Sequence, residues 1–251
     1  MTLQQFDITD RVAVVTGASS GLGRAAASAL ANAGAKVVGV ARRVHDLAAW
    51  SEETEGLTAY ECADLSNPAT MRKVASKAAE PFGPPDILVN AAGLNTREHA
   101  DDVTLEGWHR TIELNLSAPF FLAQALVPEM KKKGWGRIVN FASLQSERAF
   151  ACGIAYGASK SGVSQMTRAM AEAWSRHGIN ANALAPGFFP TELTASVFDD
   201  PERAAQNAAQ TCIGRNGTMA DIVGPMLFLA SPASDYVTGQ VLYVDGGFTA
   251  K

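Results

Sequence analysis

Short apolar runs alternate with longer alanine-rich or amphipathic stretches along the chain, and this alternation restricts the possible folds more than any other feature. Seven runs have the length and composition of buried strands, at 12–16, 36–41, 57–62, 86–90, 137–142, 180–185 and 240–245. Helices are expected in the intervals, among them 21–33, 68–80, 108–131, 155–177 and 220–230. Strands that alternate with helices form a parallel sheet covered on both faces. The expected fold is therefore α/β, with a Rossmann-like, doubly wound, seven-stranded parallel sheet.

The composition agrees with one such sheet. Hydrophobic residues make up 47% of the 251 residues, enough to cover both faces. No linker, low-complexity tract or internal repeat divides the chain, so residues 1–251 are predicted to form a single domain. The formal net charge of -4 gives no general attraction to nucleic acid or to an anionic membrane.

The cysteines and histidines show no pattern of a disulfide framework or a metal site. The N-terminal residues show no pattern of an export signal. Cys62, Cys152 and Cys212 are an odd number without a C-x-x-C pattern, and the four histidines are scattered. The first residues lack a basic region followed by an apolar one, and no apolar run approaches the ~20 residues that span a bilayer. We expect a cytoplasmic protein without a bound metal.

Tyr156 and Lys160 are the first candidates for chemistry. They are four residues apart in a segment with a helical pattern, so both side chains are expected on one helix face. A phenol ionises near pH ~10 unless a nearby positive charge favours the phenolate, and Lys160 is placed to supply that charge. Such a pair also arises by chance on many helices. Upstream, Ser143 follows a predicted buried strand, where its hydroxyl is expected to hold a substrate oxygen beside the phenol.

A glycine-rich turn directly follows the first predicted strand. Residues 17–23 read G-x-x-x-G-x-G and lead into an alanine-rich helix. Glycines let the backbone approach a ligand and a helix N-terminus favours negative charge, so strand, turn and helix together predict a phosphate site. The spacing differs from the G-x-G-x-x-G of typical two-domain dehydrogenases.

Several motifs in order and at the expected intervals resemble the classical short-chain dehydrogenase/reductase family over nearly the whole chain. They are T-G-A-S-S-G-L-G at 16–23, N-A-A-G at 90–93, Asn115, Ser143, Tyr156, Lys160 and P-G at 186–187. Ala91 stands where many members have a second asparagine, which is a familiar variation. The resemblance implies an oxidoreductase that interconverts a ketone and a secondary alcohol. Its implied catalytic residues are Asn115, Ser143, Tyr156 and Lys160.

The resemblance also implies a nicotinamide dinucleotide cofactor and its contacts. Asp64 is expected at the adenine amino group, although an Asp before a helix is also a common cap. Asn115 is expected to hold a water on the proton path from Lys160, and the Phe189 backbone and Thr191 are expected at the nicotinamide carboxamide. The full expected set is Gly17, Ser19, Ser20, Gly21, Leu22, Gly23, Arg42, Arg43, Asp64, Leu65, Asn90, Ala91, Gly93, Tyr156, Lys160, Pro186, Gly187, Phe189 and Thr191.

The end of the second predicted strand indicates which dinucleotide is preferred. Ala41 stands where an acid would hydrogen-bond a ribose 2′-hydroxyl, and Arg42 and Arg43 follow it. Guanidinium groups suit a 2′-phosphate, so we expect NADP(H) to be preferred over NAD(H), with Arg42 contributing more than Arg43. Two ordinary solvated arginines after a strand are the alternative.

The substrate is less well specified. Residues 188–214 depart from core patterning and are expected to form a mobile lid over the site. Within the family, residues 93–99, 183–192 and 233–247 look most like the sugar-acid branch, which includes gluconate 5-dehydrogenase and 2-deoxy-ketogluconate dehydrogenases. The expected substrate contacts are Arg97, Ser143, Gln145, Arg148 and Tyr156, with Arg97 or Arg148 gripping a carboxylate. Either arginine is also an ordinary surface residue in the simpler interpretation.

Three functions stay open at this point. The first is an NADP(H)-dependent oxidoreductase acting on a small sugar acid or keto acid. The second is a 3-oxoacyl thioester reductase or a broad-specificity carbonyl reductase, and the third is a cofactor-binding regulator without activity. The intact set of Ser143, Tyr156 and Lys160 disfavours the regulator. The family resemblance further implies a homotetramer, with two-fold contacts through the helix that carries Tyr156 and through the final helix and strand.

Overall fold

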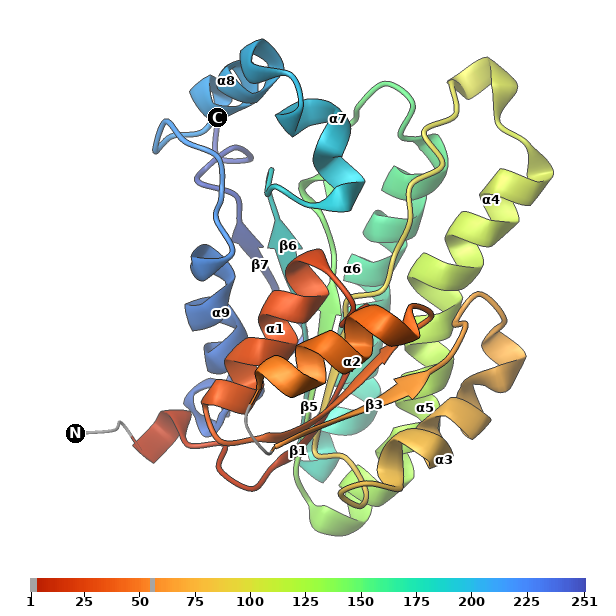
Figure 1. Cartoon of the computed structure of the whole chain (residues 1–251), viewed down its shortest axis with the longest axis vertical. Coiled ribbons are helices and arrows are strands. Elements are labelled where there is room, and N and C mark those ends of the chain that lie inside the picture. Colours follow the sequence, from red (N-terminus) through yellow and green to blue (C-terminus); the bar gives the residue numbers. More distant parts are fainter. Residues whose placement is uncertain (1–3, 55–56) are drawn as a thin grey trace.

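The computed structural model describes residues 4–54 and 57–251. All strand pairs in the described sheet are parallel, and the strand order is β3-β2-β1-β4-β5-β6-β7 (Figure 1). The strands are β1 (Val12–Thr16), β2 (Lys36–Ala41), β3 (Thr58–Cys62), β4 (Ile87–Asn90), β5 (Gly136–Phe141), β6 (Ile179–Pro186) and β7 (Val241–Val244). The order changes direction between β1 and β4, which is where ligands bind in sheets of this type.

Helices connect the strands and cover the sheet. They are α1 (Gly21–Asn32), α2 (Val44–Glu53), α3 (Met71–Ala79), α4 (Leu105–Ile112), α5 (Ala118–Lys133), α6 (Ile154–Trp174), α7 (Ala195–Phe198), α8 (Pro201–Gln210) and α9 (Ala220–Ala230). Figure 1 shows α7 and α8 beyond the carboxyl ends of β6 and β7, away from the helices that lie along the sheet.

Alternate residues of each central strand point to opposite layers. In β1, Ala13 and Val15 pack in a core with Leu30 of α1, Trp50 of α2 and Met226 of α9. Val14, between them, faces a second core that contains side chains from α3, α5 and α6. Since successive side chains of a strand point to opposite faces, a strand buried on both sides needs an unbroken apolar run. This explains why 12–16 reads as continuous rather than alternating.

The predicted fold class is confirmed, and every predicted strand is found within one or two residues of its expected ends. The continuous helix predicted at 108–131 is wrong. Helix α4 begins at Leu105, because the Thr104 hydroxyl accepts a hydrogen bond from Gly107 N at 2.9 Å and caps it. A π-helical segment, Glu113–Ser117, then separates α4 from α5. In the described ranges, no helix has the length and apolar character needed to cross a membrane.

Candidate active site

The predicted motifs meet at the carboxyl edge of the sheet. Thr16 of β1 is in register with Asn90 of β4, and Asn90 is in register with Asn140 of β5. The glycine turn, the loop after β4 and the loop that carries Ser143 therefore leave the sheet at one level. Such a shared edge is the usual ligand site of a doubly wound sheet.

The glycine turn is a cradle in which a side chain has no room. A methyl group on Gly17 would lie 2.9 Å from Ala92 N, and one on Gly23 would lie 2.3 Å from the Gly17 carbonyl oxygen. Gly17 and Gly21 also have positive φ, at 71° and 55°. At the start of α1, the N-cap Ser20 makes no side-chain capping bond. The first N–H groups of the helix are thus left for another acceptor, which fits the diphosphate of a dinucleotide.

The loop after β4 is tied to β1 by a residue outside the predicted site. The Thr16 hydroxyl accepts hydrogen bonds from Ala91 N and Ala92 N at 3.0 and 3.1 Å. The Asn90 side chain turns inward and donates to Asn140 Oδ1 at 2.9 Å. The Asn90 side chain is therefore part of the buried hydrogen bonding beneath the loop. Thr16 is the first residue of the T-G-A-S-S-G-L-G motif at 16–23, and its place in that motif is the signal that the sequence offered.

Asn115 lies in the π-helical segment and fastens the same loop. Its amide accepts from Leu94 N at 2.9 Å and donates to the Leu94 carbonyl at 2.8 Å and to Ser159 Oγ at 3.1 Å. A methyl group on Gly93 would lie 3.2 Å from Asn115 Oδ1 and 3.6 Å from Lys160 Nζ. Asn115 is thus close to Lys160. It lies in a π-helical segment, a local irregularity that is frequent at functional sites.

Ser143, Tyr156 and Lys160 come together and are all buried. Lys160 Nζ donates to the Phe141 carbonyl at 2.7 Å and lies 5.6 Å from the centroid of the Tyr156 ring. Ser143 Oγ accepts a hydrogen bond from Gln145 N at 3.1 Å, which leaves its own proton free to donate. The structure therefore brings together the three side chains that the sequence singled out.

The pKa values differ from the expectation. Burial raises the pKa of the Tyr156 phenol, and the groups that oppose this are the Ser143 hydroxyl and the Arg97 guanidinium. Lys160 is not among them. Burial lowers the pKa of Lys160 itself to about 8. The expected lowering of the Tyr156 pKa by Lys160 is thus not seen, and burial, which disfavours the charged form of each group, is the largest effect on both pKa values.

Arg43, and not Arg42, contacts the glycine turn. Arg43 Nη2 donates to Ser20 Oγ at 2.6 Å and to Ser19 Oγ at 3.2 Å. Arg42 is exposed and acts on the carboxylate of Asp64 through charge. The ranking of Arg42 before Arg43 as the residue that selects NADP(H) stays a prediction, and these contacts place Arg43 closer to the glycine turn. The reason is that the chain turns into α2 with Arg43 as its N-cap, which brings the Arg43 side chain to Ser19 and Ser20.

Asp64 and Leu65 follow β3 at the adenine side of the expected site. Asp64 is exposed, and its Oδ1 accepts from Ser66 N at 2.9 Å. This bond is the main reason why the pKa of Asp64 is lowered, so the side chain is a carboxylate. Leu65 is buried in the core beneath. The capping alternative for Asp64 is wrong, because Asn67 caps the helical turn that follows, and Asp64 holds only the local turn to Ser66.

The loop after β6 crosses toward the glycine turn. A methyl group on Gly187, which follows Pro186, would lie 2.8 Å from Asp245 Cα, so only glycine fits there. Phe189 is buried, and its carbonyl accepts a hydrogen bond from the Thr194 hydroxyl. Thr191 and Thr194 form a capping box, and a methyl group on Gly21 would lie 3.2 Å from Thr191 Cγ2. Segment 188–214, the expected lid, therefore begins directly over the turn and continues into α7 and α8.

The other three residues expected at the substrate, beside Ser143 and Tyr156, have different surroundings. Arg97, at φ 56°, donates to Ser196 Oγ at 2.9 Å and to the Leu193 carbonyl, so it contacts the lid. Its charge also reaches the Tyr156 phenol. Gln145 lies against the start of α6, since a methyl group on Gly153 would meet its Oε1 at 2.5 Å. Arg148 instead donates to the C-terminal Lys251 carbonyl at 3.2 Å and lies over the Phe248 ring.

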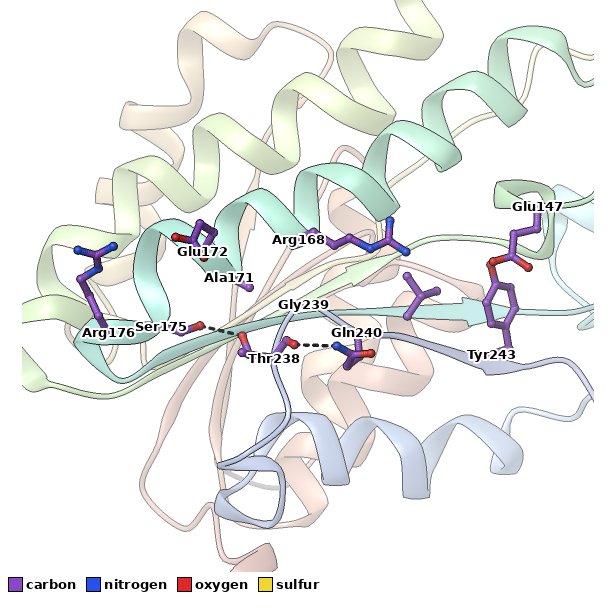
Figure 2. Close-up of a pocket in the computed structure, with 11 residues that line it drawn as sticks. Glu147, Arg168, Ala171, Glu172, Ser175, Arg176, Thr238, Gly239, Gln240 and Tyr243 are labelled. Atoms are coloured by element: carbon purple, nitrogen blue, oxygen red, sulfur yellow. Dashed lines mark hydrogen bonds between the residues drawn. The ribbon is translucent and has the colours of Figure 1, made fainter.

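A groove on another part of the surface contains none of these residues. It runs along the open edge of the sheet between α6 and β7. Figure 2 shows Arg168 and Glu172 of α6 on one side of the groove and Thr238 and Gln240 on the other. Glu147 and Tyr243 face each other at one end. Burial, with Glu147 adding to it, raises the pKa of Tyr243 to about 12. The groove is thus separate from the edge where the motifs meet.

The chain is similar to known proteins over nearly its whole length. A family model described as enoyl-(acyl carrier protein) reductase matches residues 17–249. The 2-dehydro-3-deoxy-D-gluconate 5-dehydrogenase of Escherichia coli (strain K12) is 40% identical over 258 residues, covering 100% of both chains. The chain belongs to the short-chain dehydrogenase/reductase family. As a short-chain dehydrogenase/reductase it is an oxidoreductase that acts on CH–OH and C=O groups of a small molecule.

Two further members of the short-chain dehydrogenase/reductase family bear on the cofactor. The crystal structure of a gluconate 5-dehydrogenase from Burkholderia cenocepacia J2315 in complex with NADP and tartrate matches with a TM-score of 0.95 at 36% identity, covering 100% of each chain. The NAD-dependent glycerol dehydrogenase of Listeria innocua serovar 6a (strain ATCC BAA-680 / CLIP 11262) is 36% identical over 255 residues, covering 99% of this chain and 97% of the relative. A nicotinamide dinucleotide is the cofactor of this short-chain dehydrogenase/reductase, in agreement with the cradle at the glycine turn.

Proposed function

We propose that this protein is an NADP(H)-dependent oxidoreductase that interconverts a ketone and a secondary alcohol on a small sugar acid or keto acid. The observation that carries the substrate class is the position of Arg97. Its guanidinium is the charged group whose effect reaches the Tyr156 phenol. A carboxylate held by a guanidinium fork at this point would bring the rest of a short acid beside the proton donor.

The cofactor preference rests on the surroundings of Arg43. Its guanidinium lies beside Ser19 and Ser20 of the glycine turn, and no acidic residue ends β2. An arginine in this region accommodates a 2′-phosphate, whereas an acid would select the 2′-hydroxyl of NAD(H). NADP(H), when bound, supplies or accepts the hydride at the substrate carbon.

The side chains of this protein would bind the substrate oxygen and move its proton. We assign Tyr156 as the acid in reduction and the base in oxidation. Its raised pKa keeps the phenol protonated and so able to donate in reduction, whereas its role as the base in oxidation requires a neighbouring positive charge that lowers this pKa. The free proton of Ser143 would donate to the same oxygen and orient it. Lys160, with a pKa of about 8, can release and regain a proton near neutral pH, and Asn115 holds the neighbouring loop.

The family relatives support the acid substrate. The Escherichia coli and Burkholderia cenocepacia proteins have names that refer to gluconate or a derivative of it, and the latter was crystallised with tartrate, an acid. A panel of keto acids, neutral diketones and 3-oxoacyl thioesters, followed by the loss of NADPH absorbance, tests the proposal. We expect the highest kcat/KM with a keto acid derived from a sugar. A higher value with an acyl thioester or a neutral diketone would contradict it.

We further propose that the protein is a homotetramer. Apolar side chains are exposed on α4, α5 and α6 at Leu105, Phe121 and Ile154, and on the edge strand β7 at Leu242. These two regions are separate, and two sets of isologous contacts give a closed arrangement of four chains. The exposed apolar residues support such contacts because apolar surface gains stability when a second chain covers it.

A further inference from the structure

The start of the lid is joined to the glycine turn by one ion pair. Arg43 Nη1 donates to Glu192 Oε1 at 2.7 Å, while Nη2 of the same guanidinium donates to Ser20 Oγ at 2.6 Å. Glu192 directly follows Thr191, whose methyl group packs over Gly21. The guanidinium therefore bridges the turn and the lid.

Glu192 is ionised at this position. Its pKa is lowered mainly by the hydrogen bond from Arg43, and the Ser20 hydroxyl contributes in the same direction. Arg43 has a further acidic partner, since its Nε lies 3.0 Å from Asp46 Oδ2. Asp46 belongs to α2 and stays with Arg43 on the same element, whereas Glu192 reaches across from the lid. The Glu192 carboxylate thus competes with any anion that Arg43 is to bind.

We propose that Glu192 is a specificity-determining residue for the cofactor, because its carboxylate occupies Arg43 until a 2′-phosphate replaces it. This inference rests on the proposed preference for NADP(H). A 2′-phosphate brings more negative charge to Arg43 than one carboxylate does, so the exchange is favourable for NADP(H). NAD(H) has no group to take the place of the carboxylate. It binds with the Arg43–Glu192 pair intact.

The exchange has a consequence for the lid. Arg97 holds the next turn of the lid from the other side, through Ser196 and the Leu193 carbonyl. Displacement of Glu192 would remove the ion pair at the cofactor end of this short segment, while the bonds from Arg97 and the bond from Gly217 N to the Phe188 carbonyl would remain. Replacement of Glu192 by a 2′-phosphate would therefore remove one polar contact between the lid segment and Arg43.

Binding measurements without turnover test the inference. Isothermal titration gives the Kd of NADP⁺, NAD⁺, adenosine 2′,5′-bisphosphate and adenosine 5′-monophosphate for the wild type and for Glu192→Gln. Glu192→Gln is expected to tighten NADP⁺ and the bisphosphate by about two- to fivefold, the range of a partly exposed ion pair, and to leave NAD⁺ and the monophosphate unchanged. Low ionic strength is required because the pair is exposed to solvent.

Two matched variants isolate the effect. Glu202→Gln removes an exposed acid from α8 in the same lid segment and should leave all four Kd values unchanged. In an Arg43→Ala background, Glu192→Gln should no longer tighten NADP⁺, because the group for which the carboxylate competes is gone. If Glu192→Gln lowered the Kd of NADP⁺ and of NAD⁺ equally, the inference would be wrong, and Glu192 would only repel any negatively charged ligand. Unchanged Kd values would also contradict the inference.

The same data separate this inference from the proposed function. If the wild type binds adenosine 2′,5′-bisphosphate no more tightly than the monophosphate, the NADP(H) preference itself is wrong, and the role of Glu192 with it. If the wild type prefers the bisphosphate but Glu192→Gln changes neither Kd, the preference stands and only the role of Glu192 is wrong.

Discussion

Lys160 donates its hydrogen bond to the carbonyl of Phe141 at 2.7 Å, and its Nζ lies 5.6 Å from the ring centroid of Tyr156. One turn of α6 thus supplies both side chains, while the end of β5 supplies the acceptor that holds the ammonium. The hydrogen bond to Phe141 thus holds the Lys160 ammonium next to the ring of Tyr156, the proposed proton donor.

Tyr156→Phe is expected to lower kcat for carbonyl reduction by about 10²–10⁴-fold, the typical contribution of a general acid. The substitution keeps the ring and removes only the hydroxyl, so the Kd of NADPH, measured by fluorescence titration, should be unchanged. A variant that kept most of its reductase activity would show that Tyr156 is not the acid.

Arg43→Ala is expected to raise the KM and the Kd of NADPH by about 10-fold or more, the equivalent of one charge-assisted phosphate contact. Arg42→Ala should have a smaller effect, because Arg43 is the residue beside Ser19 and Ser20. The values for NADH serve as the control and should change little in either variant. The double variant Ala41→Asp, Arg42→Ala gives the opposite test. If it reversed the preference for NADP(H) over NAD(H) while Arg43→Ala did not, Arg42 would contribute more than Arg43, as the sequence alone predicts.

Arg97→Ala is expected to raise the KM for a keto acid by about 10-fold or more and to change the KM for a neutral diketone far less. The matched control is Arg148→Ala, since Arg148 lies over Phe248 and bonds to the C-terminal residue. Equal effects of Arg97→Ala on both substrates would mean that Arg97 serves only to hold the lid, and would favour a broad carbonyl reductase.

Lys160→Met is expected to change how stability depends on pH. Burial lowers the pKa of Lys160 to about 8 in the folded protein, against ~10.4 in the unfolded chain. The unfolded chain therefore binds more protons between these values, and the wild type gains stability as the pH rises from about 8 to ~10.4. The penalty is complete below pH 8 and corresponds to about 3 kcal/mol.

Urea unfolding of both proteins at a series of pH values checks this. The free energy of unfolding of Lys160→Met relative to the wild type should be highest below pH 8 and should fall through the alkaline window. The lost bond to the Phe141 carbonyl shifts this difference by a constant that does not depend on pH. A difference that stayed flat with pH would contradict the lowered pKa.

Light scattering at micromolar concentration is expected to give the mass of four chains. Leu242→Asp places a charge on the exposed edge strand β7 and should reduce the assembly to two chains, since one of the two sets of contacts remains. Tyr60→Ser, at the opposite edge of the sheet, is the control and should leave the mass unchanged. A wild type that ran as a monomer would contradict the proposed tetramer.

The sequence was sufficient to predict the sheet and to predict which residues come together at the central site. Strands buried on both faces need continuous apolar runs, so 12–16 and 36–41 could be recognised with their observed ends. Residues that follow parallel strands meet at one edge whatever the details of packing, and Tyr156 and Lys160 share a helix face by spacing alone. These relationships depend on local periodicity, which a sequence shows directly.

Only the tertiary structure determined the pKa values of the buried groups and the contacts between segments that are distant in the sequence. The raised pKa of Tyr156 and the lowered pKa of Lys160 come from burial, which depends on what packs around α6. The Arg43–Glu192 pair joins residues 149 positions apart, and no local pattern marks either as a partner of the other. The π-helical segment at Asn115 likewise arises because that side chain bonds to Leu94 and Ser159. Periodicity is local, but hydration and long-range pairing exist only once the chain is folded.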